Sequence, residues 1–509
     1  MNLSRSARWL LSLASGILLA FAFPDYNWPI CAWFAVALLL LAINGLRPSQ
    51  AAFCGWLHGA VFYPVTIPWV FVVMRQYGNL NVPTAAAVLA LLSAVGGLLT
   101  AAFAAGVVAV SRRRGVACGL AAAPFFWVLQ EWVRTHLPNI GFPWNLAGYA
   151  AAQNLALMQL AALTGIYGLS LLVVAFNALL AWAILRRSRG AIGAVVAAAI
   201  ALACVAMIGP RFVPRGVPSE TAHLVQTNFP QSESYPPNWM ELHAPDLDEL
   251  ESISVDAARR APGVIIWPEV PAPFSLLDPR FAARVQRIAR TGDQDFLVGV
   301  VEWRREPAPA SRYDAFNSVV LLGPAGQRMF GYDKMHLVPF GEFVPWRKWL
   351  PFAGRITADI SDFTPGGVYR IGQFPGGPFG VFICYESIFP AEVRQFALHG
   401  AQLLVNVSND GWFGHSAARA QHLLMVRTRA VENRRWILRA TNNGLTVSID
   451  PYGRVLASLP MDIRGQLDAP YGFRDDRSLY SHCGDWVAWF SLIVSGFLIV
   501  LARRAARGI

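Results

Sequence analysis

Residues 380–386 read Gly-Val-Phe-Ile-Cys-Tyr-Glu, an apolar run that ends in a cysteine, a tyrosine and a carboxylate. Two further stretches share this design: 264–269 reads Val-Ile-Ile-Trp-Pro-Glu, and 403–411 reads Leu-Leu-Val-Asn-Val-Ser-Asn-Asp-Gly. Short continuous apolar runs are typical of strands that are buried on both faces. They predict a layered α/β architecture, with Glu269, Cys384 and the Asn409-Asp410 turn at strand ends, where such enzymes place their chemistry.

The sequence on either side of these runs alternates between strand and helix patterns. Strands are expected near 222–227, 264–267, 296–303, 316–322, 380–383 and 403–408, and helices near 239–260, 281–290 and 416–434. We assign residues 220–470 to one extramembrane α/β domain.

The rest of the chain is strongly apolar. The protein is 55% hydrophobic and only 14% charged, whereas soluble proteins are about 25% charged. A membrane-spanning helix needs about 20 mainly apolar residues. Eight spans are expected, near 8–23, 28–44, 51–74, 83–110, 116–133, 155–185, 190–209 and 485–502. The sequence thus predicts a polytopic α-helical membrane domain over 1–209 with seven spans, the α/β domain, and an eighth span at 485–502.

Arginine placement predicts how these spans are oriented, because basic residues accumulate in cytoplasmic loops. With the N-terminus inside, the cytoplasmic segments hold Arg5, Arg8, Arg47, Arg112, Arg113, Arg114, Arg186, Arg187, Arg189, Arg503, Arg504 and Arg507. The opposite short loops hold little beyond Arg75 and Arg134. Both termini are then cytoplasmic, and in a bacterium the α/β domain lies at the periplasmic face of the inner membrane. The same clusters account for much of the net charge of +11, so nucleic-acid binding is not expected.

Two membrane segments have two interpretations each. The N-terminal segment resembles a signal peptide, because Arg5 and Arg8 precede an apolar run and Ala20-Phe21-Ala22 matches a cleavage site. However, the run continues to Pro24 and a second span follows closely, so we expect a membrane span here. Loop 134–154 is rich in turn formers and aromatic residues. It is expected to be either an interfacial anchor or a lipid-facing floor of the active site.

Cys384 is one of only two cysteines, with Cys483, outside the apolar runs. It is either a buried structural thiol or a nucleophile, which would need a base or a nearby positive charge. His336, His415 and His422 are available, so a Cys-His arrangement stays open.

Lys334 is a second candidate because the chain has only two lysines, Lys334 and Lys348, among 42 basic residues. A lysine retained where arginine is otherwise used suggests a need for a compact ammonium group; chance retention is the alternative. Glu269 follows Trp267-Pro268, which suggests a partly desolvated carboxylate suited to a general base, although a solvent-exposed strand-end glutamate would look the same. Glu342, in a Pro/Gly-rich loop, is a further acidic candidate.

The order Trp267-Pro268-Glu269, Tyr332-Asp333-Lys334 and Cys384-Tyr385-Glu386 resembles the Glu-Lys-Cys pattern of the nitrilase, or carbon–nitrogen hydrolase, superfamily. Within this superfamily, the resemblance is made more specific by loop 337–345, the turn 407–414 and the eight expected spans. The whole chain resembles the apolipoprotein N-acyltransferase family. This resemblance implies an α-β-β-α sandwich and a two-step acyl transfer without metal or cofactor.

The resemblance also implies roles for individual residues. Glu269 would be the base, Lys334 the oxyanion donor, and Cys384 the nucleophile that carries a thioester. Glu342, Tyr385 and Glu386 would support them, and Trp412 would lie near the acyl chain or in a lid. The donor would be a membrane phospholipid, most simply phosphatidylethanolamine, and the acceptor the α-amino group of a diacylated apolipoprotein.

One departure from the family concerns the loop after Asn228-Phe229-Pro230-Gln231-Ser232, where Tyr235 stands near the position of a frequent Trp. Tyr235 and Asn409 are therefore candidate substrate contacts only.

Two rival functions stay open. The first is a membrane-tethered amidase that uses water as acceptor. The second is a transporter, whose spans should carry ionisable residues near mid-membrane; Glu131 and His58 are the notable candidates. The sequence gives no sign of oligomerisation, so a monomer is expected.

Overall fold

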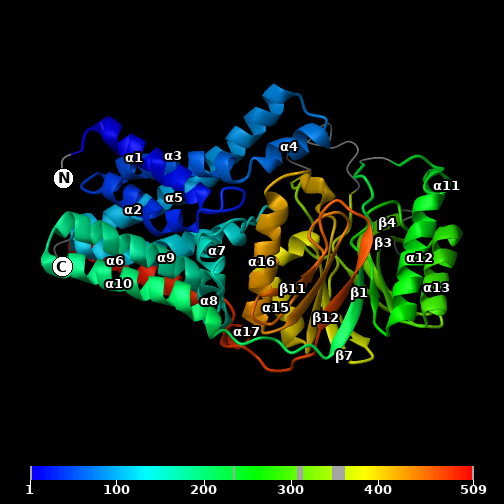
Figure 1. Ribbon diagram of the computed structural model, residues 1–509. Helices are drawn as coiled ribbons and strands as arrows, with labels where there is room; N and C mark the ends of the chain where they lie inside the picture. Colours follow the sequence, from blue (N-terminus) through cyan, green and yellow to red (C-terminus); the bar gives the residue numbers. More distant parts are fainter. Residues whose placement is uncertain (1–2, 233–234, 306–312, 347–361, 507–509) are drawn as a thin grey trace.

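The computed structural model describes residues 3–232, 235–305, 313–346 and 362–506. A bundle of helices, which includes both ends of the chain, lies beside a unit with two β-sheets (Figure 1). The two parts meet along α16 (Ala418–Asn433), which packs against α9 (Ala161–Arg186).

In the described part of the chain, five helices are long and apolar enough to cross a membrane. They are α5 (Val82–Arg114), α6 (Val116–Thr135), α9, α10 (Arg189–Ile208), which continues through η2 (Gly209–Arg211), and α18 (Trp486–Ala506). A sixth span results if α3 (Pro48–Thr66) and α4 (Trp69–Gln76) are counted together, although they are bent by 57°. The chain is therefore a membrane protein, with fewer long apolar helices than the eight expected.

The differences from the expected spans have local causes. Helix α1 (Arg5–Phe21) has 17 residues, and η1 (Pro29–Cys31) with α2 (Ala32–Ile43) is shorter still, so both fall below the length of about 20 residues that a span needs. The expected span 51–74 is broken before Pro68, because proline lacks the N–H that a continuing helix requires. The expected span 155–185 is divided into α8 (Leu155–Met158) and α9, and Gly165 inside α9 has a φ of +63°.

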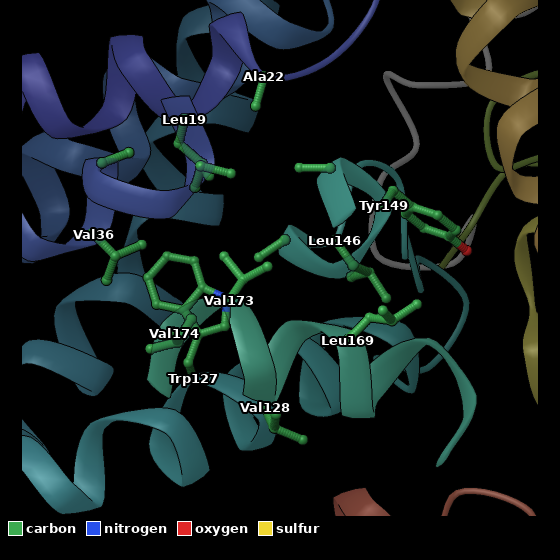
Figure 2. Packing of buried hydrophobic residues seen from close by; sticks show 14 of the residues in the cluster. Leu19, Ala22, Val36, Trp127, Val128, Leu146, Tyr149, Leu169, Val173 and Val174 are labelled. Atoms are coloured by element: carbon green, nitrogen blue, oxygen red, sulfur yellow. The ribbon is translucent and has the colours of Figure 1, made fainter. Parts of the chain in front are cut away.

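The helical part has its own buried core. Leu19 from α1, Val36 from α2, Trp127 from α6 and Val173 from α9 converge there (Figure 2). The buried Asn177 of α9 adds polar cross-links, because its amide donates to the carbonyl of Ala32 and its oxygen accepts from the N–H of Ala37. The short helices α1 and α2 are thus fixed against the long ones.

Over its described residues, the α/β part forms two six-stranded sheets. The first has the order β12-β1-β2-β3-β4-β5, and the second the order β11-β10-β9-β8-β7-β6. The first sheet comprises β1 (Glu220–Gln226), β2 (Ile265–Ile266), β3 (Phe296–Arg305), β4 (Tyr313–Leu322), β5 (Arg328–Asp333) and β12 (Gly465–Tyr471). The second comprises β6 (Ile371–Phe374), β7 (Gly377–Ile383), β8 (Leu403–Ser408), β9 (Trp436–Thr441), β10 (Val447–Ile449) and β11 (Val455–Ser458).

Four layers result from the packing of these sheets. Apolar side chains such as Leu224 and Leu297 of one sheet and Val405 and Leu438 of the other share a core between the sheets. Helices α12 (Ala244–Arg260) and α13 (Pro279–Gly292) cover the first sheet, and α15 (Pro390–Leu398) and α16 cover the second. The expected α-β-β-α sandwich is confirmed. The expected helix 239–260 is interrupted at His243, which separates α11 (Trp239–Leu242) from α12.

Candidate active site

Cys384 lies immediately after β7 and is buried, with 6% of its surface exposed. Its backbone has a φ of +46°, in the left-handed region that a residue with a Cβ rarely adopts. A strained residue of this kind persists only when its surroundings hold it, and such residues cluster at functional sites. The geometry therefore favours the nucleophile over the structural thiol.

Glu269, which follows β2, accepts hydrogen bonds at both carboxylate oxygens. Its Oε1 accepts from Nζ of Lys334 at 2.9 Å and from Nδ2 of Asn317 at 2.7 Å. Its Oε2 accepts from the N–H of Asn409 at 2.8 Å. The side chain is buried, so the exposed strand-end glutamate is excluded. The contact with Asn409 joins the ends of strands in the two different sheets.

Lys334 follows β5, and its ammonium group lies between two carboxylates. Nζ is 2.9 Å from Oε1 of Glu269 and 2.9 Å from Oε1 of Glu342, and the side chain is almost completely buried. Burial alone would lower the pKa of Lys334, but the negative charges of Glu269 and Glu342 raise it well above its usual value. Lys334 is therefore a fixed cation. Lys348 lies outside the described residues.

Glu342 is held in its loop by its second oxygen. Oε2 accepts from the N–H of Val338 at 2.8 Å, while Oε1 accepts from Nδ2 of Asn317 at 2.9 Å as well as from Lys334. Asn317 thus bridges Glu269 and Glu342. The sequence did not single out this residue, because it stands inside β4 without any distinguishing neighbour.

The thiol of Cys384 is neutral in this environment. Burial raises its pKa most, the negative charge of Glu269 raises it further, and the positive charge of Lys334 partly opposes both. A cysteine with a raised pKa needs a base to become the reactive thiolate. Among the carboxylates that act on this thiol, Glu269 has a larger effect on its pKa than Asp410, so we take Glu269 as the candidate base.

Glu386 lies behind the nucleophile as a buried cross-link. Its Oε1 accepts from the Tyr332 hydroxyl at 2.8 Å and from the N–H of Met335 at 2.7 Å, and its Oε2 accepts from the N–H of Ile383 at 2.6 Å. Burial raises the pKa of Glu386 to about 7. Glu386 therefore connects the strand before Cys384 with the segment that carries Lys334, and does not face the reacting atoms.

The candidate histidines His336, His415 and His422 do not pair with the thiol of Cys384. His422, fully buried in α16, has Nε2 2.6 Å from the Ser387 hydroxyl and 3.2 Å from the backbone carbonyl of Cys384. Its Nδ1 lies 3.1 Å from Oδ1 of Asp410. His336 pairs with Glu392, and His415 is 85% exposed. His422 contacts the backbone of the nucleophile and is a positioning group.

Asp410 is itself fixed by Arg439, whose Nη2 donates to its Oδ2 at 2.7 Å. Burial would raise the pKa of Asp410, but the positive charge of Arg439 and the contact with Nδ1 of His422 hold it far below the usual range. An ionised Asp410 thus orients His422 from within the domain.

The helical part reaches the site through α4. The Tyr77 hydroxyl, just beyond α4, donates to the carbonyl of Gly411 at 2.9 Å, and its ring lies 5.2 Å from that of Trp412. Trp412 belongs to η4 (Asp410–Phe413) and is 39% exposed. Its contact with an acyl chain stays a prediction.

Loop 134–154 also contacts the α/β domain directly. The Tyr385 hydroxyl donates to the carbonyl of Gly141 at 3.1 Å, and the buried Trp144 donates to Oε1 of Gln421. Trp144 stacks on His422 with ring centres 5.8 Å apart. Part of the loop is therefore packed beneath the site rather than lying as a free interfacial anchor.

The two candidate substrate contacts differ in position. Asn409 lies within the site, and its Nδ2 donates to Oε1 of Gln231 at 2.7 Å. Tyr235 packs against Trp239 at 6.0 Å, and its hydroxyl is 3.5 Å from the carbonyl of Pro271. The structure does not bring Tyr235 to the group formed by Glu269, Lys334 and Cys384. Within the described ranges, no group of three or more His, Cys, Asp or Glu is arranged to hold a metal ion.

The chain is similar to known proteins along nearly its whole length. Residues 15–179 match the family described as Apolipoprotein N-acyltransferase N-terminal domain, and residues 224–469 match Carbon-nitrogen hydrolase. Apolipoprotein N-acyltransferase of Geobacter metallireducens is 34% identical, with 97% of this chain and 95% of the relative covered. The protein of that name from Methylococcus capsulatus is 36% identical, with 97% and 96% covered. An amidase structure from Nesterenkonia sp. has 20% identity and a TM-score of 0.38 over 53% of this chain and 97% of the amidase.

Proposed function

The chain belongs to the apolipoprotein N-acyltransferases, and from this premise we propose that Cys384 carries the acyl group as a thioester between a membrane phospholipid and the α-amino group of a diacylated apolipoprotein. The observation that carries the proposal is the buried ammonium group of Lys334, held between Glu269 and Glu342 beside the strained cysteine. The enzyme is an acyltransferase.

In the first step, Glu269 takes the proton from Sγ of Cys384, and the thiolate attacks the ester carbonyl carbon of the phospholipid. Lys334 has three N–H donors, two of which point to Glu269 and Glu342. The third donor stabilises the oxyanion, a contribution that is worth about 3–4 kcal/mol for one donor in other enzymes. The ester C–O bond then breaks, and the leaving oxygen takes the proton from Glu269, which releases a lysophospholipid.

In the second step, the α-amino nitrogen of the apolipoprotein attacks the thioester carbonyl. Glu269 accepts a proton from that nitrogen, the C–S bond breaks, and the proton passes to Sγ. The products are an amide on the apolipoprotein and the free thiol of Cys384. Burial of the thioester excludes water and limits its hydrolysis.

The supporting residues keep this geometry. Glu342 and Asn317 fix Lys334 and Glu269, and Glu386 ties the segment before Cys384 to the segment after Lys334. Asn409 orients Glu269 through its backbone N–H. We place Trp412 against the donor chain, because it is partly exposed beside α4 of the membrane domain. Tyr235 stays a candidate substrate contact that packs against Trp239, apart from Glu269, Lys334 and Cys384.

We also propose eight membrane crossings over 1–209 and 485–502, with the domain 220–470 periplasmic and both termini cytoplasmic. Helix α1 is about 25 Å long at 1.5 Å per residue, and adjoining residues extend it toward the bilayer thickness of about 30 Å. The arginines in the last turns of α5 and α18 support this orientation. We expect phosphatidylethanolamine as the donor and a monomer as the active form.

The rival function is hydrolysis, with water as acceptor in the same site. The contacts of Tyr77 and Tyr385 that join the site to the membrane domain favour lipid substrates. Purified protein incubated with chain-labelled phosphatidylethanolamine and a diacylated lipopeptide tests this. We expect label on the lipopeptide, and none with Cys384→Ala; release of labelled fatty acid without acylated peptide would support the hydrolase instead.

A further inference from the structure

A cavity of about 390 Å³, away from Cys384, lies between the helical part and the α/β domain. Helix α8, the segment after α10, the end of α16 and the turn after β10 contribute to it. Its lining includes Gln159, Phe212, Arg434, Tyr452, Arg474 and Asp476. This volume is within the range of small-molecule sites.

The two arginines of this cavity differ in their charge partners. Arg474 is neutralised by Asp476, whose oxygens lie 2.7 and 2.8 Å from its guanidinium. Arg434 donates only to neutral oxygens, those of Gln159 at 2.7 Å and Pro451 at 3.3 Å. Among the described residues, no carboxylate lies within 4.0 Å of Arg434. The cavity thus contains a cation without a counter-charge in contact.

The Arg434 guanidinium is also held in place. Gln159 accepts from it and donates to the Tyr452 carbonyl at 2.9 Å, and the guanidinium carbon lies 4.9 Å from the centre of the Tyr452 ring. A planar guanidinium offers five N–H donors, of which only those of Nη1 are used in these contacts. The remaining donors are available for an anion, and the Tyr452 hydroxyl adds a further donor.

The cavity lies at the end of a membrane span. Helix α10 ends at Ile208, and Phe212, which lines the cavity, is 78% exposed four residues later. Ala191 is the single buried residue of α10, which is described throughout, and Met207 is 77% exposed. Residues just beyond a span lie at the level of lipid headgroups. An apolar helix face therefore leads from the bilayer directly to Arg434.

We propose that this cavity binds the phosphate of a membrane phospholipid through Arg434, with the acyl chains along α10. Arginine is the preferred partner for phosphate because its planar donor fork matches two phosphate oxygens. A lipid bound in this cavity anchors the α/β domain to the bilayer next to α10.

This site is distinct from the one at Cys384. His422 of α16 contacts the Cys384 carbonyl. Arg434 caps the C-terminal end of the same helix, 12 residues further along the chain. At 1.5 Å per residue they are separated by about 18 Å. The lipid bound at Arg434 is therefore not the reacting donor.

Lipid binding by the full-length Cys384→Ala protein, followed by native mass spectrometry, tests the proposal without any turnover. The probes are dioleoylphosphatidylglycerol, dioleoylglycerol, which lacks the phosphate, and inorganic phosphate. We expect Arg434→Gln to weaken one phosphatidylglycerol-binding step by about tenfold or more, as for the loss of a charge-assisted hydrogen bond. Arg434→Lys should weaken it less, and Arg259→Gln, an exposed arginine of α12 on the far side of the domain, should have no effect.

Three results would overturn the proposal: equal binding by the parent and Arg434→Gln, equal affinity for dioleoylglycerol at that step, or displacement of the lipid by millimolar inorganic phosphate. Phe212→Ser decides the matter if Arg434→Gln does not fold, because the Phe212 side chain is exposed. It should weaken phosphatidylglycerol binding, and unchanged binding in both Phe212→Ser and Arg434→Lys would contradict the lipid site.

Discussion

Nζ of Lys334 lies 2.9 Å from Oε1 of Glu269, and both side chains are buried. An ion pair in this position holds the proposed base, Glu269, and the proposed oxyanion donor, Lys334, at one fixed separation. It also means that a change to either partner leaves the other as a buried charge with fewer partners, which is costly.

Replacing Lys334 by arginine should abolish most of the turnover. A larger planar cation cannot donate from the same point to Glu269, Glu342 and the oxyanion. We expect acyl transfer to fall by about 10²–10³-fold, as for the loss of one oxyanion donor. Label transfer from phospholipid to lipopeptide measures the effect, and near-normal turnover of Lys334→Arg would show that the oxyanion is stabilised elsewhere.

Glu269→Gln should make the thiol of Cys384 more acidic and yet abolish acyl transfer. The negative charge of Glu269 raises the pKa of Cys384, so its removal should lower that pKa and increase alkylation by iodoacetamide at mildly alkaline pH. Acyl transfer should nevertheless be lost, because no base remains. Mass spectrometry of the alkylated protein gives the rate, and slower alkylation of the variant would contradict the arrangement.

His422→Asn should lower kcat by roughly tenfold or more with little change in KM, because losing a buried hydrogen-bond partner costs about 1–3 kcal/mol. The substitution removes the contact of His422 with the backbone carbonyl of Cys384 and leaves the substrate contacts unchanged. His415→Asn is the matched control, since this side chain is exposed. An unchanged kcat in the folded His422→Asn protein would remove the positioning role.

Glu386 should make stability depend on pH. Its pKa of about 7 in the folded protein lies above the ordinary value of 4.5, so the folded state binds the proton more tightly than the unfolded state. Stability should fall as pH rises from about 4.5 to 7 and then level off. The melting temperature of Cys384→Ala, compared with Cys384→Ala/Glu386→Gln across this range, isolates the effect; parallel curves would contradict it.

Tyr385→Phe should weaken the contact between the two parts of the molecule. The change removes the donor to Gly141 and should cost about 0.5–1.5 kcal/mol, seen as a lower melting temperature in detergent. Tyr313→Phe, at an exposed position of β4, is the control. Equal melting temperatures for the two variants would show that the hydroxyl of Tyr385 does not stabilise the junction.

Much of the site could be predicted because chemistry follows buried strands. Glu269 and Cys384 each end an apolar run, and the scarcity of lysine indicated Lys334. Asn317 could not be predicted, since it stands within β4 and becomes a bridge only when β4, β5 and loop 337–345 come together. His422 stayed open because spacing along the chain does not reveal whether an imidazole meets a thiol or a carbonyl.

The membrane domain was predicted in outline but not in detail. Hydropathy located all the apolar segments, yet Pro68 turns α4 out of the axis of α3 toward the active site, and Gly165 breaks the start of α9. Hydropathy averages over a window and does not register such single-residue breaks. As a result α4, after which Tyr77 meets Gly411, was expected as the end of the single span 51–74.

Intact-mass analysis of the protein after mixing with phosphatidylethanolamine tests the central claim most directly. We predict a mass increase of one acyl group that is absent in Cys384→Ala. This increase should disappear when a diacylated lipopeptide is added, and the acyl mass should then be found on the peptide. Acylated lipopeptide formed in a rapidly quenched time course without any acyl adduct on Cys384 would contradict it.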